Sequence, residues 1–304
     1  MKFEEFRENA ITKFKEYVTK NDKELIIQKV FKNNLIKEGL TIKEKNNNIA
    51  PTIYIEDLYK TYRLNNEIIN FNDFIENIIN DIQTNSKEVQ EIKEFFDKKN
   101  FSWDSMKDNI IFTLMNTKQN ENSLKNMPHR EFLDLSIIYR ILIGNYGSII
   151  IKNDLMSILQ LSEDELYNLA YKNTKNLLNI SVKDMNDIMP MGIFSLEKSF
   201  YILNSKDYPF SSCGILYSEF LEDVSQKVDS DLYLIPSSVH EFLLISADSI
   251  PASEISQFVP DVNRIQVHLE EQLSNQVYLY NKDTKEITII SKNKEELQEY
   301  DNYE

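Results

Sequence analysis

The chain has 304 residues and a formal net charge of −15, which is enough length for one large domain or two ordinary domains with cores that need no disulfides. Its single cysteine, Cys213, excludes an intramolecular disulfide framework and every zinc site that needs two thiolates. Its five glycines form no GxGxxG or GxxxxGK run, so no glycine-rich nucleotide-binding loop is expected.

The first third of the chain mixes helical and strand patterns. Apolar residues at spacings of three and four predict an amphipathic helix from Phe3 to Val18. A second amphipathic helix is expected over 71–82, with Asn72 or Asp73 as its N-cap. The remaining expected elements are strands at 24–31, 39–42 and 49–55, a turn at 46–48 between the last two strands, and a helix at 88–96.

The middle third is more apolar. A single long strand is expected over 131–143, and Ser162 with acidic residues after it predicts a capped helix that runs to about Asn173. A shorter helix is expected to open at Ser181. The other elements expected here are strands at 109–114 and 148–151.

The last third again alternates the two patterns. The expected elements are strands at 199–203, 232–235 and 242–245, helices at 214–228 and 252–264, and a hairpin of 276–280 with 286–290. We therefore predict an α+β fold, with helices packed on mainly antiparallel sheet. The expected organisation is an N-terminal region 1–105, a C-terminal region 106–290 that is separate or continuous with it, and a frayed acidic tail 291–304.

Charge is unevenly distributed along the chain. Residues 1–150 have a net charge of −1, and residues 151–304 have a net charge of −14. Such a field repels nucleic acid and anionic membranes and favours a protein partner with a basic surface, although it also serves solubility alone. Met1–Ala10 is too charged for a signal peptide, so a cytoplasmic protein without membrane contact is expected.

Several short motifs follow one another in a fixed order. They are Gly39-Leu40-Thr41, Ala50-Pro51-Thr52-Ile53-Tyr54, Pro128-His129-Arg130, Phe132-Leu133-Asp134-Leu135, Leu169-Ala170-x-x-Asn173-Thr174, Tyr201-Ile202-Leu203-Asn204, Gly214-x-Leu216-Tyr217, the run Leu234 to Glu241, Val262-Asn263, and Leu273-Ser274-Asn275-x-Val277-Tyr278. Together they resemble an uncharacterised family of clostridial and related Firmicutes proteins, domain of unknown function 5688, over roughly residues 30–282. Asn275 stands where the family pattern has Asp, and Cys213 where it has a small residue. The resemblance implies an association with mobile elements and no settled activity.

Few residues are candidates for chemistry. The run Ser237-Ser238-Val239-His240-Glu241 lies between two expected strands, and its hydroxyls, imidazole and carboxylate could bind an anion or transfer protons. The alternative is a tight connection whose serines satisfy backbone groups. His129 and Asp134 are weaker catalytic candidates: His129-Arg130-Glu131 contains the His-x-Glu pair of zinc deaminases, but no Pro-Cys-x-x-Cys follows it. We expect no metal and no cofactor.

Three functional hypotheses remain. The first is a non-enzymatic binding or regulatory protein, in its narrower form an acidic decoy that inhibits a nucleic-acid-handling or immune protein in mobile-element conflict, with no direct contact to nucleic acid. The second is an unrecognised hydrolase that uses His240, Glu241 and His129. The third is a structural module with a homodimeric interface. The sequence leaves the oligomeric state open.

Overall fold

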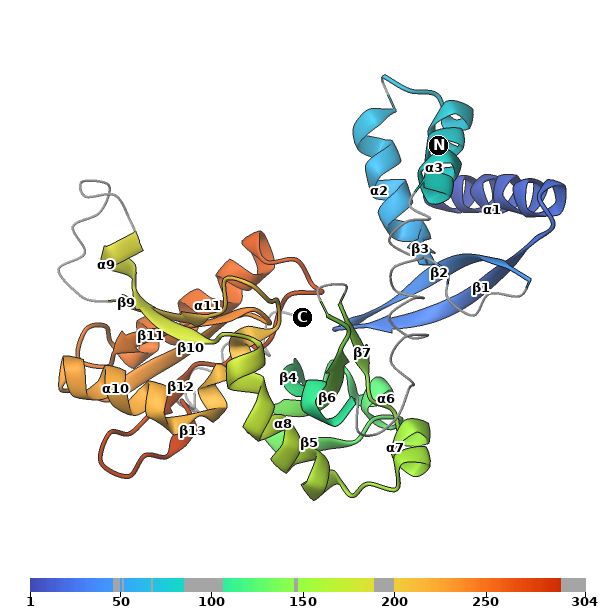
Figure 1. The fold of residues 1–304 in the computed structure, drawn as a ribbon. Coiled ribbons are helices and arrows are strands. Elements are labelled where there is room, and N and C mark those ends of the chain that lie inside the picture. Colours follow the sequence, from blue (N-terminus) through green and yellow to red (C-terminus); the bar gives the residue numbers. More distant parts are fainter. Residues whose placement is uncertain are drawn as a thin grey trace. The chain divides into compact units, whose positions relative to one another are not determined.

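A computed structural model describes residues 1–45, 50, 52–66, 68–84, 106–144, 147–188 and 200–290. The chain divides into two compact units, residues 1–105 with 143–147, and residues 106–142 with 148–304. Both units combine helices with antiparallel sheet (Figure 1), which confirms the predicted α+β class. Among the described helices, none is long and apolar enough to cross a membrane.

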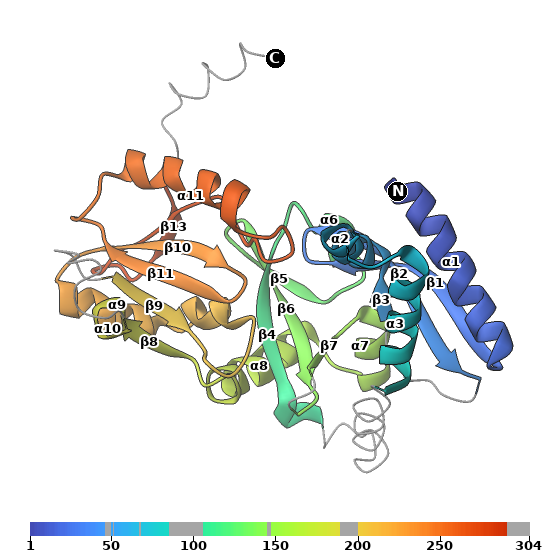
Figure 2. The ribbon, with the colours of Figure 1, turned by 90° about the horizontal axis from the view of Figure 1, so that it is seen from above.

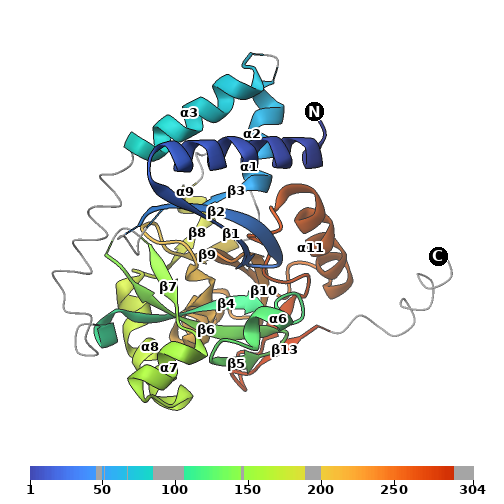
Figure 3. The same ribbon diagram turned by 90° about the vertical axis from the view of Figure 1, so that its right-hand side faces the viewer.

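The first unit packs three helices on one side of a three-stranded sheet (Figure 3). Its elements are α1 (Phe3–Lys20), β1 (Lys23–Lys32), β2 (Leu35–Glu44), β3 (Thr52–Tyr54), α2 (Ile55–Asn65) and α3 (Phe71–Thr84). The core is formed by the apolar stripe of α1, with Phe6 and Phe14 fully buried beside Leu40 of β2. The N-cap of α3 is Asn70, because its side-chain oxygen accepts the Asp73 N–H at 3.1 Å; the predicted caps Asn72 and Asp73 are wrong. The turn expected at 46–48 and the helix expected at 88–96 lie outside the described residues.

The second unit contains two sheets, of which the smaller has the strand order β4-β6-β5, with β7 also paired to β6. Its elements are η1 (Lys107–Asn109), β4 (Ile110–Asn116), α6 (Glu121–Leu124), β5 (His129–Phe132), β6 (Leu135–Leu142), β7 (Ser148–Ile150), α7 (Asn153–Leu159) and α8 (Glu163–Leu177). The single strand predicted over 131–143 is wrong. Leu133 has a positive φ of 57°, and with Asp134 it turns β5 back onto β6. Leucine is rare in this conformation, so no turn was predicted there.

The larger sheet has the strand order β13-β12-β10-β11-β9-β8. Its elements are β8 (Ser181–Asp184), α9 (Met185–Ile188), β9 (Phe200–Asn204), η2 (Ser211–Leu216), α10 (Ser218–Val228), β10 (Leu232–Ser238), β11 (Glu241–Ser246), α11 (Ala252–Gln266), β12 (Tyr278–Tyr280) and β13 (Ile287–Ile289). Helices α10 and α11 lie on opposite sides of the sheet (Figure 2). The helix predicted at Ser181 is wrong, since Val182 pairs with Leu203 in an edge strand. The helix predicted from Gly214 begins only at Ser218, after a 3-10 turn.

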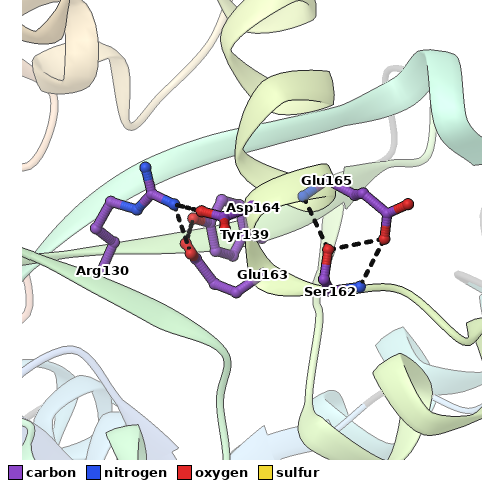
Figure 4. A network of polar contacts seen from close by, with 6 residues as sticks. All are labelled: Arg130, Tyr139, Ser162, Glu163, Asp164 and Glu165. Atoms are coloured by element: carbon purple, nitrogen blue, oxygen red, sulfur yellow. Dashed lines mark hydrogen bonds and ion pairs between the residues drawn. The ribbon is translucent and has the colours of Figure 1, made fainter.

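The predicted cap of α8 is confirmed. The Ser162 hydroxyl accepts the Glu165 N–H at 3.3 Å, and the Glu165 carboxylate accepts the Ser162 N–H at 2.9 Å (Figure 4). This reciprocal capping box satisfies two N–H groups that the helix itself leaves without partners.

We expect Ser162→Ala to lower the free energy of unfolding by about 1 kcal/mol, because loss of a cap hydroxyl typically costs that much. Chemical denaturation followed by circular dichroism measures the change. Ser157→Ala is the matched control, since Ser157 is exposed on α7 and bonds only to the Asn153 carbonyl one turn earlier. Equal effects of the two substitutions would contradict the capping role.

Candidate binding groove

An apolar groove of about 420 Å³ lies between α11 and the strands β9, β10 and β11. That volume falls within the range of small-molecule and side-chain binding pockets. Apolar side chains dominate its lining. They are Phe200, Ile235 and Leu243 from the sheet and Ile255, Phe258 and Val262 from α11. Ser237, Glu254 and Asn263 supply polar groups.

Helix α11 forms one wall of the groove, with one face buried against the sheet and another lining the groove. Ile255 and Val259, four residues apart, are buried against the sheet. Phe258 is on the groove side, and 61% of its surface is exposed. The exposed phenyl ring of Phe258 and the apolar groove form one continuous apolar surface. Such a surface is typical of a binding site, whereas isolated apolar residues are common on any protein surface. The prediction of helix 252–264 did not identify this face.

Asn263 fixes the C-terminal end of α11. Its buried side-chain amide donates to the Ser274 carbonyl at 2.9 Å and to the Asn275 side-chain oxygen at 2.8 Å. In return, the Gln272 amide donates to the Asn263 carbonyl at 2.8 Å. These bonds tie the helix to the loop that enters β12, so the groove wall is held in place by hydrogen bonds as well as by packing.

The predicted binding run at the β10–β11 connection is a tight turn. β10 ends at Ser238 and β11 begins at Glu241, so only two residues connect them. The Ser237 hydroxyl donates to the Glu241 carboxylate at 3.1 Å, and the Ser238 hydroxyl accepts the His240 N–H at 3.1 Å. The serines therefore satisfy local groups, and Ser237 also lines the groove.

His240 is held by groups outside that turn. Its Nδ1 accepts the Phe210 N–H at 3.1 Å, which places the imidazole proton on Nε2. Nε2 lies 3.8 Å from the Glu271 carboxylate. Because 37% of the side chain is exposed, His240 is accessible to solvent.

The other two catalytic candidates have separate partners. His129 is exposed on β5, with its Nδ1 2.9 Å from the Met127 carbonyl. The Asp134 carboxylate accepts bonds from the hydroxyls of Ser274 and Tyr278, both at 2.6 Å. Within the described ranges, no hydrogen bond or ion pair joins His129 or Asp134 to the His240 turn. Burial also raises the pKa of the Cys213 thiol, which disfavours the reactive thiolate.

Acidic side chains occupy two different environments in this part of the chain. On and near α10 they pair with lysines; the pairs are Glu219–Lys175, Glu222–Lys285, Asp223–Lys227 and Asp229–Lys282, at 2.6–2.8 Å. At the groove, Glu254 belongs to the lining, and the Glu241 carboxylate accepts a bond from the lining residue Ser237. These two groove-edge acids, Glu241 and Glu254, have no lysine or arginine partner among the described residues.

The groove-edge acids were only partly predicted. The sequence identified Glu241, but as a possible catalytic group, and it located the negative charge no more closely than residues 151–304. In the parts of the chain that the structure describes, no three His, Cys, Asp or Glu side chains are grouped to hold a metal ion.

Comparison with known proteins identifies relatives without a known activity. A family model described as a family of unknown function (DUF5688) matches residues 3–282. No curated protein and no solved structure matches the chain.

Proposed function

This chain belongs to DUF5688, a family of unknown function, and we propose that it is a non-enzymatic binding protein whose groove takes an apolar, positively charged segment of a partner protein. The observation that carries the proposal is the combination at one place of an open apolar groove and carboxylates without cationic partners. Residues 200–290 contain five basic and fourteen acidic side chains, so a basic partner is also favoured at longer range.

The two features contribute differently to binding. Burying one large apolar side chain of the partner contributes roughly 1.5–3 kcal/mol, so two or three anchors in the groove would supply most of the affinity. The groove-edge acids would orient the partner and speed its approach, and they would discriminate against acidic segments. An amphipathic helix with apolar side chains at spacings of three and four and a basic polar face fits this description.

The hydrolase hypothesis needs His240, Glu241 and His129 to meet at one substrate. Each of them has its own local partner, and His129 belongs to the other sheet of the unit. A general acid and base must lie within hydrogen-bond reach of the same reacting group. The binding hypothesis has no such requirement. Its narrower form is an acidic decoy in mobile-element conflict, whose partner is a nucleic-acid-handling or immune protein.

Two synthetic helical peptides test the proposal. Both carry the same Leu and Phe anchors, and their polar faces are either all Lys or all Glu. We expect the Lys peptide to bind the full chain with a Kd in the micromolar range and the Glu peptide to bind at least about tenfold more weakly, as measured by fluorescence anisotropy. Phe258→Asp is expected to weaken binding of the Lys peptide at least about tenfold, since it places a charge in the apolar surface.

The matched control concerns charge. Glu241→Gln with Glu254→Gln removes two negative charges at the groove, and Asp207→Asn with Asp283→Asn removes two exposed ones elsewhere. Only the groove pair should weaken binding and reduce its salt dependence. Equal effects of the two pairs would show that the attraction is unspecific. In a separate measurement by sedimentation, a wild-type dimer that Phe258→Asp abolishes would show instead that a second copy of the chain occupies the groove.

A further inference from the structure

Arg140 is a charged side chain on β6 that pairs with no carboxylate among the residues that the structure describes. Its Nε donates to the Thr113 hydroxyl and its Nη1 to the Ser148 hydroxyl, both at 3.2 Å. Its guanidinium carbon lies 4.5 Å from the centre of the Phe210 ring. No Asp or Glu of the described ranges forms an ion pair with it, so these residues supply no counter-charge.

Arg130, on the neighbouring strand β5, shows what a neutralised arginine looks like in the same sheet (Figure 4). Its Nη2 donates to the Glu163 carboxylate at 2.7 Å and to the Asp164 carboxylate at 2.5 Å. Arg130 is paired with Ile137 across the strands and therefore faces α8, on the same side as Tyr139. Arg140 is one residue beyond Tyr139 and points to the opposite side of the sheet.

A charge without a counter-ion is costly in this environment. Burial lowers the pKa of Arg140 to about 10, which still leaves the guanidinium charged at neutral pH. Of its five N–H donors, two are used by Thr113 and Ser148, which leaves three. A planar fork of donors with a positive charge is the group that proteins use to bind phosphate and carboxylate.

Phe210 is placed against Arg140 by a strained turn. Its φ of 65° is unusual for a bulky residue, and three hydrogen bonds hold it. The Phe210 N–H donates to His240, the Ser211 hydroxyl donates to the His240 carbonyl at 2.7 Å, and the same hydroxyl accepts the Ser205 N–H at 2.9 Å. His240 is thus a positioning residue for the aromatic wall beside the guanidinium.

We propose that Arg140, with the Ser148 hydroxyl and the Phe210 ring beside it, binds a small-molecule oxyanion, either a phosphate or a carboxylate group. The free edge of the guanidinium would donate two parallel bonds to two oxygens of the anion. The Ser148 hydroxyl, which accepts from Arg140, keeps its own proton to donate. This site is separate from the groove of α11 and does not depend on the function proposed for it.

Calorimetric titration of the full chain with inorganic phosphate, acetate and citrate tests this site. We expect one-to-one binding of at least one anion, and the comparison of phosphate with the two carboxylates identifies the preferred group. Arg140→Gln is expected to weaken that binding at least about tenfold, and Ser148→Ala several-fold. Arg264→Gln is the control, because it removes an exposed arginine that already pairs with Asp261, and it should leave the affinity unchanged.

Two further variants guard against misfolding. Arg140→Lys keeps the charge but loses the planar fork of donors. The variant should fold, and its affinity for the anion should be at least about fivefold lower than that of wild type. His240→Ala should weaken binding through Phe210 while circular dichroism stays native. The proposal is overturned if no anion binds the wild-type chain at millimolar concentration, or if the folded Arg140 variants bind with unchanged affinity.

Discussion

Replacing Asp134 by alanine is expected to lower the free energy of unfolding by about 3–5 kcal/mol. Its carboxylate accepts two short hydrogen bonds, from Ser274 and from Tyr278. Bonds to a charged acceptor contribute about 1.5–3 kcal/mol each, and the substitution also leaves the fully buried Tyr278 hydroxyl without its acceptor. Chemical denaturation followed by circular dichroism measures this change in the free energy of unfolding.

Three variants separate this role from catalysis. Asp134→Asn keeps an acceptor oxygen without the charge and should lose about half as much stability as Asp134→Ala. Asp283→Ala, at an exposed acid in the β12–β13 turn, should change stability by less than about 0.5 kcal/mol. Tyr278→Phe removes one of the two bonds alone. If Asp134→Ala were as stable as wild type, the carboxylate would be free for chemistry, as the hydrolase hypothesis requires.

Asp134 connects two motifs that lie far apart in sequence, Phe132-Leu133-Asp134-Leu135 and Leu273-Ser274-Asn275-x-Val277-Tyr278. It is in the turn between β5 and β6, whereas Ser274 lies just before β12 of the larger sheet and Tyr278 is the first residue of β12. A second bond, from the Asn116 amide to the Leu273 carbonyl at 3.1 Å, joins the same two sheets. These motif residues therefore connect the two sheets of the second unit, and their spacing reflects folding more directly than it reflects a reaction.

Local patterns predicted most elements of the fold. The apolar spacing of α1, the capping box of α8 and the short apolar runs of β10 and β11 each contain their own signal. The failures occurred where a distant contact decides the conformation. At the turn that contains Leu133, the Asp134 carbonyl accepts the Thr117 N–H at 3.0 Å, a contact from a distant part of the sequence. Ser181–Asp184 form a strand because they pair with the edge of β9.

The candidate sites were less predictable than the fold, because they depend on the neighbours that a side chain has in the folded chain. The stripe of α11 predicts that Ile255 and Val259 are buried, but nothing local shows that Phe258 stays exposed beside a groove. Arg130 and Arg140 are equally ordinary in sequence. Only their partners distinguish them, two carboxylates for one and two hydroxyls for the other.

Alkaline pH is expected to destabilise the chain steeply. Burial raises the pKa values of Tyr139, Tyr217 and Tyr278, and for Tyr139 and Tyr278 the adjacent carboxylates raise them further. A raised pKa in the folded state means that the stabilisation is complete below the unfolded-state pKa of about 10 and is lost as the pH rises above it. Above that pH, each such tyrosine lowers the free energy of unfolding by about 1.4 kcal/mol per pH unit, and the three together lower it by about 4 kcal/mol per pH unit.

Comparison of variants isolates this effect from the titration of lysines. Between about pH 9 and pH 11, Tyr278→Phe should lose less stability than wild type, by about 1.4 kcal/mol, although it starts from a lower value because the bond to Asp134 is gone. Tyr171→Phe is the control, since Tyr171 is 40% exposed and the variant keeps all three buried hydroxyls. Urea denaturation at both pH values measures the difference. Equal falls in wild type and Tyr278→Phe would mean that this hydroxyl ionises in the folded chain, and that Asp134 does not hold it in the way its geometry indicates.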